Sequence, residues 1–298
     1  LPKHRKMRRR SPTELKVIDE WLQDAIKNGF VEECKEAPHA AEVVLVSQKG
    51  KTRICQDYRA LNKATRDDIY PQQPMHEVLA AVQGKKYFTV LDALKGYYQI
   101  PIAKASRHAA AFKTYRGTYQ FRRMPFGLKN APHQFNRWVS KIFKGIDGVF
   151  RYMDDIIIAT NTLEDHTNIL EEVLKRCKQH GLILKAEKSV FLATEVKILG
   201  HIVSKKGLRP DPEKVRALAE YGRPRNVGEM QSFLGLLSYY RKFCAMLAED
   251  TRQLRDMTKG RKKGEELKWT ESSKREFQNA RNKLATEALL HPPDVEKP

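Results

Sequence analysis

Two adjacent aspartates lie inside an apolar stretch of the sequence. Asp154 and Asp155 follow Tyr152-Met153 and precede three consecutive isoleucines. Neighbouring carboxylates repel each other and lose water on burial, so such a pair is costly unless something compensates for it. Two explanations stay open: the pair lies in a tight hairpin turn and points into solvent, or a divalent cation neutralises it.

A third carboxylate favours the cation. Asp92 ends the strand-like run Tyr87–Leu91, and it would join the pair if the two strands were neighbours. Three carboxylates suit a pair of Mg²⁺ ions roughly 3.5–4 Å apart, the arrangement that serves in-line phosphoryl transfer. One ion lowers the pKa of an attacking hydroxyl, and the other holds a triphosphate and stabilises the leaving pyrophosphate.

The positive charge of the chain is concentrated in two stretches. The 298 residues carry a formal net charge of +20. Residues 93–146 contain eleven basic side chains and no carboxylate, and residues 1–13 contain six basic side chains. Charge this dense indicates a polyanionic partner, foremost a nucleic acid. A basic surface without a specific target is the open alternative, and residues 1–13 could be a solvated arm.

Other classes of protein are excluded by the composition. The sequence contains no stretch of about 18 apolar residues, the length that a membrane-spanning helix needs. The four cysteines are far apart and form no C-x-x-C pair, which favours free thiols in a reducing compartment over a disulfide framework or a zinc site. The first residue is Leu1, followed by a basic run, so we expect a piece of a longer product.

The elements that position the carboxylates alternate between strand and helix patterns. Ser11 and Glu14 form a capping box before a helix that ends at Gly29, and Lys49-Gly50 predicts a hairpin turn. Strand-like runs lie at 42–47, 52–58, 87–91, 112–121, 150–160, 189–192 and 197–203, and helical patterns at 132–143, 163–180, 212–221, 228–247 and 271–290. We therefore expect an α+β body with a mixed, mostly antiparallel sheet, followed by a helical C-terminal part.

The aspartate pair belongs to a recognisable series of motifs. Tyr152-Met153-Asp154-Asp155 resembles the YxDD box of reverse transcriptases. Further blocks of that family occur in the expected order, at 57–63, 91–100, 124–135, 199–201 and 232–243. From about residue 11 to 293, the sequence is similar to the reverse transcriptase (polymerase region of Pol) of a gypsy-type LTR retrotransposon, related to retroviral reverse transcriptases.

The resemblance implies an α+β right-hand polymerase with fingers, a palm of antiparallel sheet backed by helices, and a helical thumb. It divides the chain into fingers at 1–67 and 100–130, palm at 68–99 and 131–205, and thumb at 206–298 with the start of a connection to an RNase H domain. Residues 292–298 resemble the stretch before that domain, so we expect no RNase H, protease or integrase activity from this sequence.

The resemblance also implies an RNA-directed DNA polymerase, a nucleotidyltransferase that extends a primer 3′-OH with dNTPs on an RNA or DNA template. Two Mg²⁺ ions are the implied cofactors, with Mn²⁺ as an alternative. The implied partners are an RNA template, a DNA primer, an RNA/DNA hybrid duplex and dNTPs, without a membrane. The implied location is intracellular, in the cytoplasmic virus-like particle of the element.

Residue roles follow from the same resemblance. Asp92, Asp154 and Asp155 would be catalytic and would bind the metal ions, together with the carbonyl of Ala93. The residues expected to bind the dNTP are Lys49, Arg53, Tyr97 and Phe126, and those expected to contact primer or template are Tyr152, Met153, Gly200, His201, Gln231 and Gly235. Tyr97 would be the steric gate, because a ring under the deoxyribose leaves no room for a 2′-OH.

Plainer interpretations of these residues stay open. Lys49 and Arg53 could be solvated hairpin cations, Tyr97 a core aromatic residue, Phe126 part of an ordinary turn, and Gly200 a β-turn glycine. The helix at 228–247 is expected to place Phe233, Leu234, Leu237 and Tyr240 in the core and Tyr239 beside Gln231 and Gly235, where they could track a minor groove.

Two rival functions stay open as well. A co-opted, non-catalytic nucleic-acid-binding protein could retain the fold, although it would have no need for three costly carboxylates. An RNA-directed RNA polymerase would use the same palm chemistry, but it needs the room for a 2′-OH that Tyr97 would remove.

Overall fold

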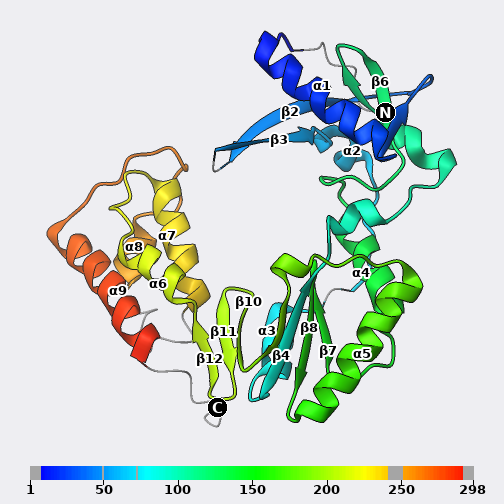
Figure 1. The fold of residues 1–298 in the computed structure, drawn as a ribbon. Helices are drawn as coiled ribbons and strands as arrows, with labels where there is room; N and C mark the ends of the chain where they lie inside the picture. The colour runs from blue at the N-terminus through cyan, green and yellow to red at the C-terminus, as the bar shows by residue number, and fades with distance from the viewer. Residues whose placement is uncertain (1–7, 49, 72, 241–250, 291–298) are drawn as a thin grey trace. The chain divides into compact units, whose positions relative to one another are not determined.

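The computed structural model describes residues 8–48, 50–71, 73–240 and 251–290. Contacts divide the chain into two compact units: Leu1–Gln73, Leu91–Ile156 and Ile169–Ser189 form the first, and Pro74–Val90, Ile157–Asn168 and Val190–Pro298 form the second. The limits between the units fall within strands β4 (Tyr87–Asp92) and β8 (Asp155–Thr160), both of which are labelled in Figure 1. These limits cut across the predicted fingers, palm and thumb, whose boundaries stay a prediction.

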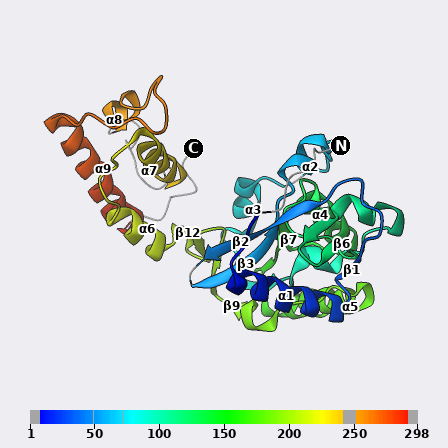
Figure 2. The same ribbon diagram turned by 90° about the horizontal axis from the view of Figure 1, so that it is seen from above.

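A five-stranded sheet and one long helix build the core of the first unit. The sheet order is β1-β6-β5-β2-β3, and all pairs are antiparallel except β2 with β5. Its strands are β1 (Val31–Glu33), β2 (Ala41–Gln48), β3 (Lys51–Gln56), β5 (Phe112–Thr114) and β6 (Gly117–Phe121). Helix α1 (Pro12–Lys27) lies along this sheet (Figure 2) and packs Ile18 and Leu22 against Phe112 and Phe121.

The start of α1 follows the predicted capping box. The backbone N–H of Glu14 donates to Ser11 Oγ at 3.2 Å, and the backbone N–H of Ser11 donates to Glu14 Oε2 at 2.9 Å. These two bonds satisfy two of the donors that a helix N-terminus leaves open. The helix ends before Gly29, whose φ of 70° is costly for any residue with a Cβ. The predicted helix is therefore confirmed.

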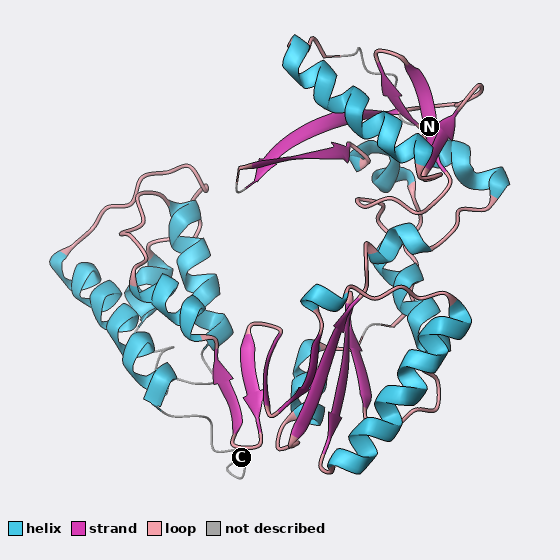
Figure 3. Cartoon of the chain, in the orientation of Figure 1, coloured by secondary structure: helices cyan, strands magenta, loops and turns pink. Residues whose placement is uncertain are grey.

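A four-stranded sheet of order β7-β8-β4-β9 carries the aspartates (Figure 3). Strands β7 (Val149–Tyr152) and β8 form a hairpin around Met153 and Asp154, which divides the strand-like run predicted at 150–160. Strand β9 is Val190–Ala193. Burial of the three isoleucines of β8 anchors the hairpin. The same part of the chain also contains helices α2 (Arg59–Ala64), α4 (Ala131–Ile142) and α5 (Leu163–His180), and 3₁₀ turns at Gly96–Gln99, Lys104–Ala110 and Ala186–Lys188.

The second unit combines a small antiparallel sheet with a helical part. The strands are β10 (Glu195–Ile198), β11 (His201–Ser204) and β12 (Gly207–Pro210), and the helices are α3 (Met75–Val82), α6 (Pro212–Ala219), α7 (Val227–Tyr240), α8 (Arg252–Asp256) and α9 (Glu271–Leu290). The single strand predicted at 197–203 was wrong. Leu199 and Gly200 have φ values of 52° and 77°, and two successive left-handed residues make a tight hairpin turn.

The helical part has an aromatic core. Phe233 of α7 packs against Phe277 of α9 with ring centroids 4.7 Å apart, and Leu237 is also buried. The end of the helix predicted at 228–247 lies outside the described residues from residue 241 on. None of the helices in the described ranges is both long and apolar enough to span a bilayer.

Candidate active site

The backbone at the end of β4 holds Asp92 in place. The Asp92 N–H donates to Ser189 Oγ at 3.2 Å, and the Asp92 carbonyl accepts from the Lys185 N–H at 2.8 Å. Both partners come from the short segment that precedes β9. The Asp92 side chain itself is 28% exposed, so its carboxylate can reach a ligand.

The β7–β8 hairpin presents Asp154 and Asp155 from inside the protein. Met153 turns the chain with a φ of 52°, and both aspartates are partly buried. Asp154 Oδ1 is fully buried, and no hydrogen-bond donor of the described chain reaches it. A carboxylate oxygen without a donor is costly to bury. The explanation that the pair points freely into solvent therefore fails.

The three aspartates lie close enough together to interact electrostatically. Burial raises the pKa of Asp154, and the charge of Asp92 raises it further. The pKa of Asp155 is raised by burial and then by Asp92 and Asp154. Lys188 counteracts both shifts, and its Nζ lies 3.6 Å from Asp92 Oδ2. The site therefore concentrates negative charge that a cation would stabilise.

The negative charge of this site suits a divalent cation, but the described side chains do not form a complete set of metal ligands in this structure. Among the described residues, no three His, Cys, Asp or Glu side chains lie close enough together to form a metal centre. The orphaned Asp154 Oδ1 and the raised pKa values nevertheless match what a divalent cation would relieve. Ala93 forms an isolated bridge with Leu184, and the two hydrogen bonds that close it come from neighbouring residues. The Ala93 carbonyl is not used in this bridge.

Tyr97 follows Asp92 and joins an aromatic cluster. Its ring centroid lies 4.9 Å from that of Phe126 and 5.8 Å from that of Phe135. Burial and the nearby charge of Asp154 raise the pKa of Tyr97 to about 12, so the phenol stays neutral at physiological pH. A Cβ on Gly96 would lie 2.9 Å from the Phe135 ring, and this close approach explains why a glycine precedes Tyr97.

Two asparagines hold the turn that carries Phe126. The Asn62 amide donates to the Gly127 carbonyl at 2.8 Å and accepts from the Lys129 N–H at 2.9 Å. Asn130 bridges back to the segment after α2, because it donates to the Arg66 carbonyl and accepts from the Asp68 N–H. Phe126 itself is 45% exposed, and its predicted role in the nucleotide site stays a prediction.

Several supporting residues were missed from the sequence. Asn62, Asn130 and Gln99 all lie in the recognised blocks, and this was the available signal for them. Gln99 fastens the chain beyond Asp92, since its amide donates to the carbonyls of Leu94 and Ile183 and accepts from the Ile183 N–H. No sequence signal pointed to Lys188, because only the fold brings it near Asp92.

Of the other residues expected around the nucleotide and the primer, the structure gives the position and the exposure of Arg53, Tyr152 and Met153. Lys49 lies outside the described residues. Arg53 is exposed on β3, opposite Val46. Tyr152 is half-buried at the end of β7, and Met153 is 54% exposed in the turn.

In the second unit, the predicted primer contact at the β10–β11 turn involves a buried histidine. His201 is fully buried, and its Nδ1 lies 3.1 Å from the Leu199 carbonyl and 3.2 Å from the Tyr239 hydroxyl. His201 as a whole exposes no surface in this structure, and its contact with a primer stays a prediction. A Cβ on Gly200 would meet Lys214 Nζ at 2.5 Å.

Helix α7 separates its predicted core and exposed residues. Phe233 and Leu237 are buried, whereas Gln231 and Gly235 are exposed one turn apart and share one face. Tyr239 was expected beside them, but its hydroxyl donates to the Leu199 carbonyl. It therefore ties α7 to the β10–β11 turn. The side chain of Tyr240 lies outside the described residues.

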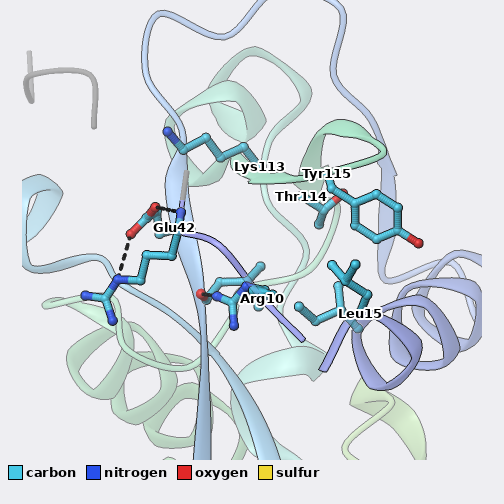
Figure 4. Close-up of a pocket in the computed structure, with 9 residues that line it drawn as sticks. Arg10, Leu15, Glu42, Lys113, Thr114 and Tyr115 are labelled. Carbon is cyan, nitrogen blue, oxygen red and sulfur yellow. Dashed lines mark hydrogen bonds and ion pairs between the residues drawn. The ribbon is translucent and has the colours of Figure 1, made fainter. Parts of the chain in front are cut away.

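Part of the basic N-terminus is used inside the first unit. Arg8 makes an ion pair with Glu42 at 3.4 Å, and its N–H donates to the same carboxylate. Arg10 donates to the Val43 carbonyl and lines a pocket with Leu15, Glu42, Lys113, Thr114 and Tyr115 (Figure 4). These two arginines do not form a free solvated arm, while residues 1–7 lie outside the described part.

Comparisons with known proteins agree with the motifs. Residues 38–203 match the family model described as reverse transcriptase (RNA-dependent DNA polymerase). The Retrovirus-related Pol polyprotein from transposon opus of Drosophila melanogaster is 38% identical over 251 residues, which cover 82% of this chain and 24% of the relative. The Retrovirus-related Pol polyprotein from transposon gypsy of the same organism is 34% identical over 299 residues, covering 94% and 29%. The chain thus spans about a quarter of the length of these relatives.

Solved structures confirm the α+β right-hand polymerase fold. The foamy viral protease-reverse transcriptase dRH in complex with double-stranded DNA matches with a TM-score of 0.87 at 28% identity, over 96% of this chain and 50% of that chain. The foamy viral protease-reverse transcriptase in complex with an RNA/DNA hybrid matches with a TM-score of 0.86 at 26% identity, over 96% and 39%. From its family match, its relatives among retrotransposon Pol polyproteins and its fold, this chain belongs to the reverse transcriptase (RNA-dependent DNA polymerase) family.

Proposed function

We propose that this chain is the polymerase part of a reverse transcriptase that extends a primer 3′-OH with dNTPs on an RNA or DNA template. The observation that carries the proposal is that Asp92, Asp154 and Asp155 lie close enough for their charges to repel one another. Burial and mutual repulsion raise the pKa of both hairpin aspartates. A protein that only binds nucleic acid gains nothing from this costly arrangement.

The three carboxylates and the Ala93 carbonyl would hold two Mg²⁺ ions, with Mn²⁺ as an alternative. When bound, the ions would lower the pKa of the primer hydroxyl and stabilise the leaving pyrophosphate. Asp154 offers the acceptor that supports this assignment most directly, because its buried Oδ1 receives no hydrogen bond from the described chain.

Tyr97, Phe126, Arg53 and Lys49 would form the dNTP site. The Tyr97 ring would exclude a 2′-OH, and the contact with Phe126 at 4.9 Å and Phe135 at 5.8 Å supports this role by limiting the movement of the ring. Arg53 would offer a planar fork to the triphosphate, and Lys49 a point charge.

The nucleic-acid partners would be an RNA template, a DNA primer and their hybrid duplex. The matched foamy viral enzymes were solved with double-stranded DNA and with an RNA/DNA hybrid, which supports this assignment. Contacts would come from Tyr152, Met153, the β10–β11 turn at Gly200, and the exposed α7 residues Gln231 and Gly235. A location in the virus-like particle of a retrotransposon follows from the same proposal.

The test is extension of a labelled DNA primer on a defined RNA template, with Mg²⁺ or EDTA and with dNTPs or NTPs. Mg²⁺-dependent extension with dNTPs is the expected result. Tight duplex binding without extension would favour the non-catalytic rival, and efficient extension with NTPs would favour an RNA polymerase.

A further inference from the structure

Strand β9 contains an irregularity at Leu192, at the edge of the four-stranded sheet. Leu192 has a φ of 49°, which is uncommon for a residue with a branched side chain. The register of β9 against β4 shifts between Phe88 and Val90, as it does at a β-bulge. A bulge removes a backbone donor from the ladder, and here the Leu192 N–H donates to Thr89 Oγ1 at 3.2 Å.

The Thr89 hydroxyl belongs to a directed chain of hydrogen bonds through His166. Thr89 Oγ1 lies 2.8 Å from His166 Nε2, and Thr160 Oγ1 lies 3.0 Å from His166 Nδ1. Thr160 uses its own proton for the Thr162 carbonyl at 3.0 Å, so it accepts from His166 Nδ1. The Nδ1 atom therefore carries the ring proton, and Nε2 accepts from the Thr89 hydroxyl.

A second proton on the ring would break this chain. Thr89 Oγ1 would then face two donors, Leu192 N–H and His166 Nε2–H, and its own proton would lose its acceptor. His166 and Thr89 are fully buried, so water cannot replace the lost partner without cost. The chain of bonds therefore requires a neutral imidazole.

The surroundings of the ring support the neutral form. Strand β4 presents Thr89 and the Tyr87 ring, whose centroid lies 6.5 Å away, β8 presents Thr160, and β9 presents backbone. The acidic residues beside His166 on α5, Glu164 and Asp165, are exposed. Burial lowers the pKa of His166, and no charge facing the ring reverses this shift.

We propose that His166 is a positioning residue for the strand that carries Asp92. As a neutral imidazole protonated on Nδ1, it orients the Thr89 hydroxyl that captures the bulged strand β9. Thr89 precedes Asp92 by three residues in β4, and Thr160 ends β8, which begins at Asp155. The consequence for catalysis rests on the polymerase function proposed above.

The experiment compares paired variants by amide exchange and ring NMR. Thr89→Val removes the hydroxyl and keeps the shape, whereas Thr89→Ser keeps the hydroxyl. His166→Phe removes both ring nitrogens, whereas His166→Gln keeps one donor and one acceptor. ¹⁵N NMR of the wild-type ring should report Nδ1–H, with a titration midpoint below the value of about 6.5 for a free histidine.

Thr89→Val and His166→Phe should accelerate exchange of the Leu192 amide about tenfold or more, with Thr89→Ser and His166→Gln near wild type. Primer extension should show a lower kcat in Thr89→Val at nearly unchanged KM for dNTP. An Nε2–H ring, equal Leu192 exchange in the two Thr89 variants, or an unchanged kcat in Thr89→Val would overturn the proposal. The NMR measurements need no polymerase activity, so a wild-type protein that extends no primer would count against the proposed function alone.

Discussion

Lys188 Nζ lies 3.6 Å from Asp92 Oδ2. The same ammonium group opposes the rise in pKa of Asp154 and Asp155. A cation of the protein itself therefore stands beside the carboxylates that we assign to metal binding. Since like charges repel, Lys188 and a divalent cation would compete for this region.

Replacing Lys188 by methionine should strengthen Mg²⁺ binding. Exposed ion pairs contribute about 0.2–1 kcal/mol, so the Mg²⁺ concentration for half-maximal primer extension should fall by a factor between about 1.4 and 5. Lys178→Met, on the exposed face at the end of α5, is the matched control and should leave it unchanged. A higher Mg²⁺ requirement in Lys188→Met would mean that the lysine assists the metal site.

Shortening Tyr97 should admit ribonucleotides. Tyr97→Ala removes the ring that contacts Phe126, and discrimination between dNTP and NTP should fall by about 10²-fold, the scale of a single steric contact. Tyr97→Phe keeps the ring and should keep the discrimination. The ratio of kcat/KM for the two substrates is the measurement, and equal ratios in wild type and Tyr97→Ala would rule out the steric gate.

A methyl group at residue 96 should disturb the same cluster. Gly96→Ala places a Cβ 2.9 Å from the Phe135 ring, and such overpacking costs about 1–3 kcal/mol. Chemical denaturation should detect the loss, and Phe135→Leu in the same chain should restore part of it. Gly222→Ala is the control, because a Cβ there meets nothing within 4 Å. Equal stability of the two alanine variants would show that the cluster has room.

The raised carboxyl pKa values predict how stability depends on pH without metal. A carboxyl whose pKa is raised in the folded state favours folding when protonated and loses this contribution as pH rises. In EDTA, Asp154→Asn should therefore have a higher Tm than wild type at pH 7. This difference should shrink as pH falls through the raised pKa toward the ordinary value of 3.8.

Asp19 provides a control of opposite sign. Arg116 donates two hydrogen bonds of 2.7 Å to this carboxylate. This hydrogen bonding is the main reason why the pKa of Asp19 is lowered. Asp19→Asn should therefore lower the Tm at pH 7. If Asp154→Asn also lowered it in EDTA, the aspartates would not be under electrostatic strain.

Local signals predicted much of this architecture. Helix α1 and strands β2, β3, β4 and β8 formed as expected, because their signals depend on neighbours in sequence: the Ser11–Glu14 capping box, the alternation around Lys49-Gly50, and the apolar runs that end at Asp92 and begin at Asp155. The strand predicted at 197–203 ran through this turn, although a β-turn at Gly200 was an open alternative, because leucine seldom adopts the left-handed conformation that Leu199 has here. Its conformation is supported by long-range bonds from Tyr239, which no local pattern reveals.

The supporting residues of the site were harder to predict for the same reason. Lys188 meets Asp92 across 95 intervening residues, and its neighbours in sequence, Glu187 and Ser189, are ordinary polar residues. His166 follows two acidic residues at the start of α5, where a solvated side chain is the usual expectation. Its burial depends on Thr89 and Thr160, which come from two different strands.

We expect Asp154 to serve the chemistry of primer extension and not the binding of the duplex. The most direct measurement is single-turnover primer extension by Asp154→Asn on an RNA template with Mg²⁺, with duplex affinity measured on the same preparation. We predict that extension falls by about 10³-fold or more while the Kd for the duplex stays close to that of wild type. Extension near the wild-type rate, or a loss explained by weaker duplex binding, would mean that the Asp154 carboxylate has no part in the chemistry.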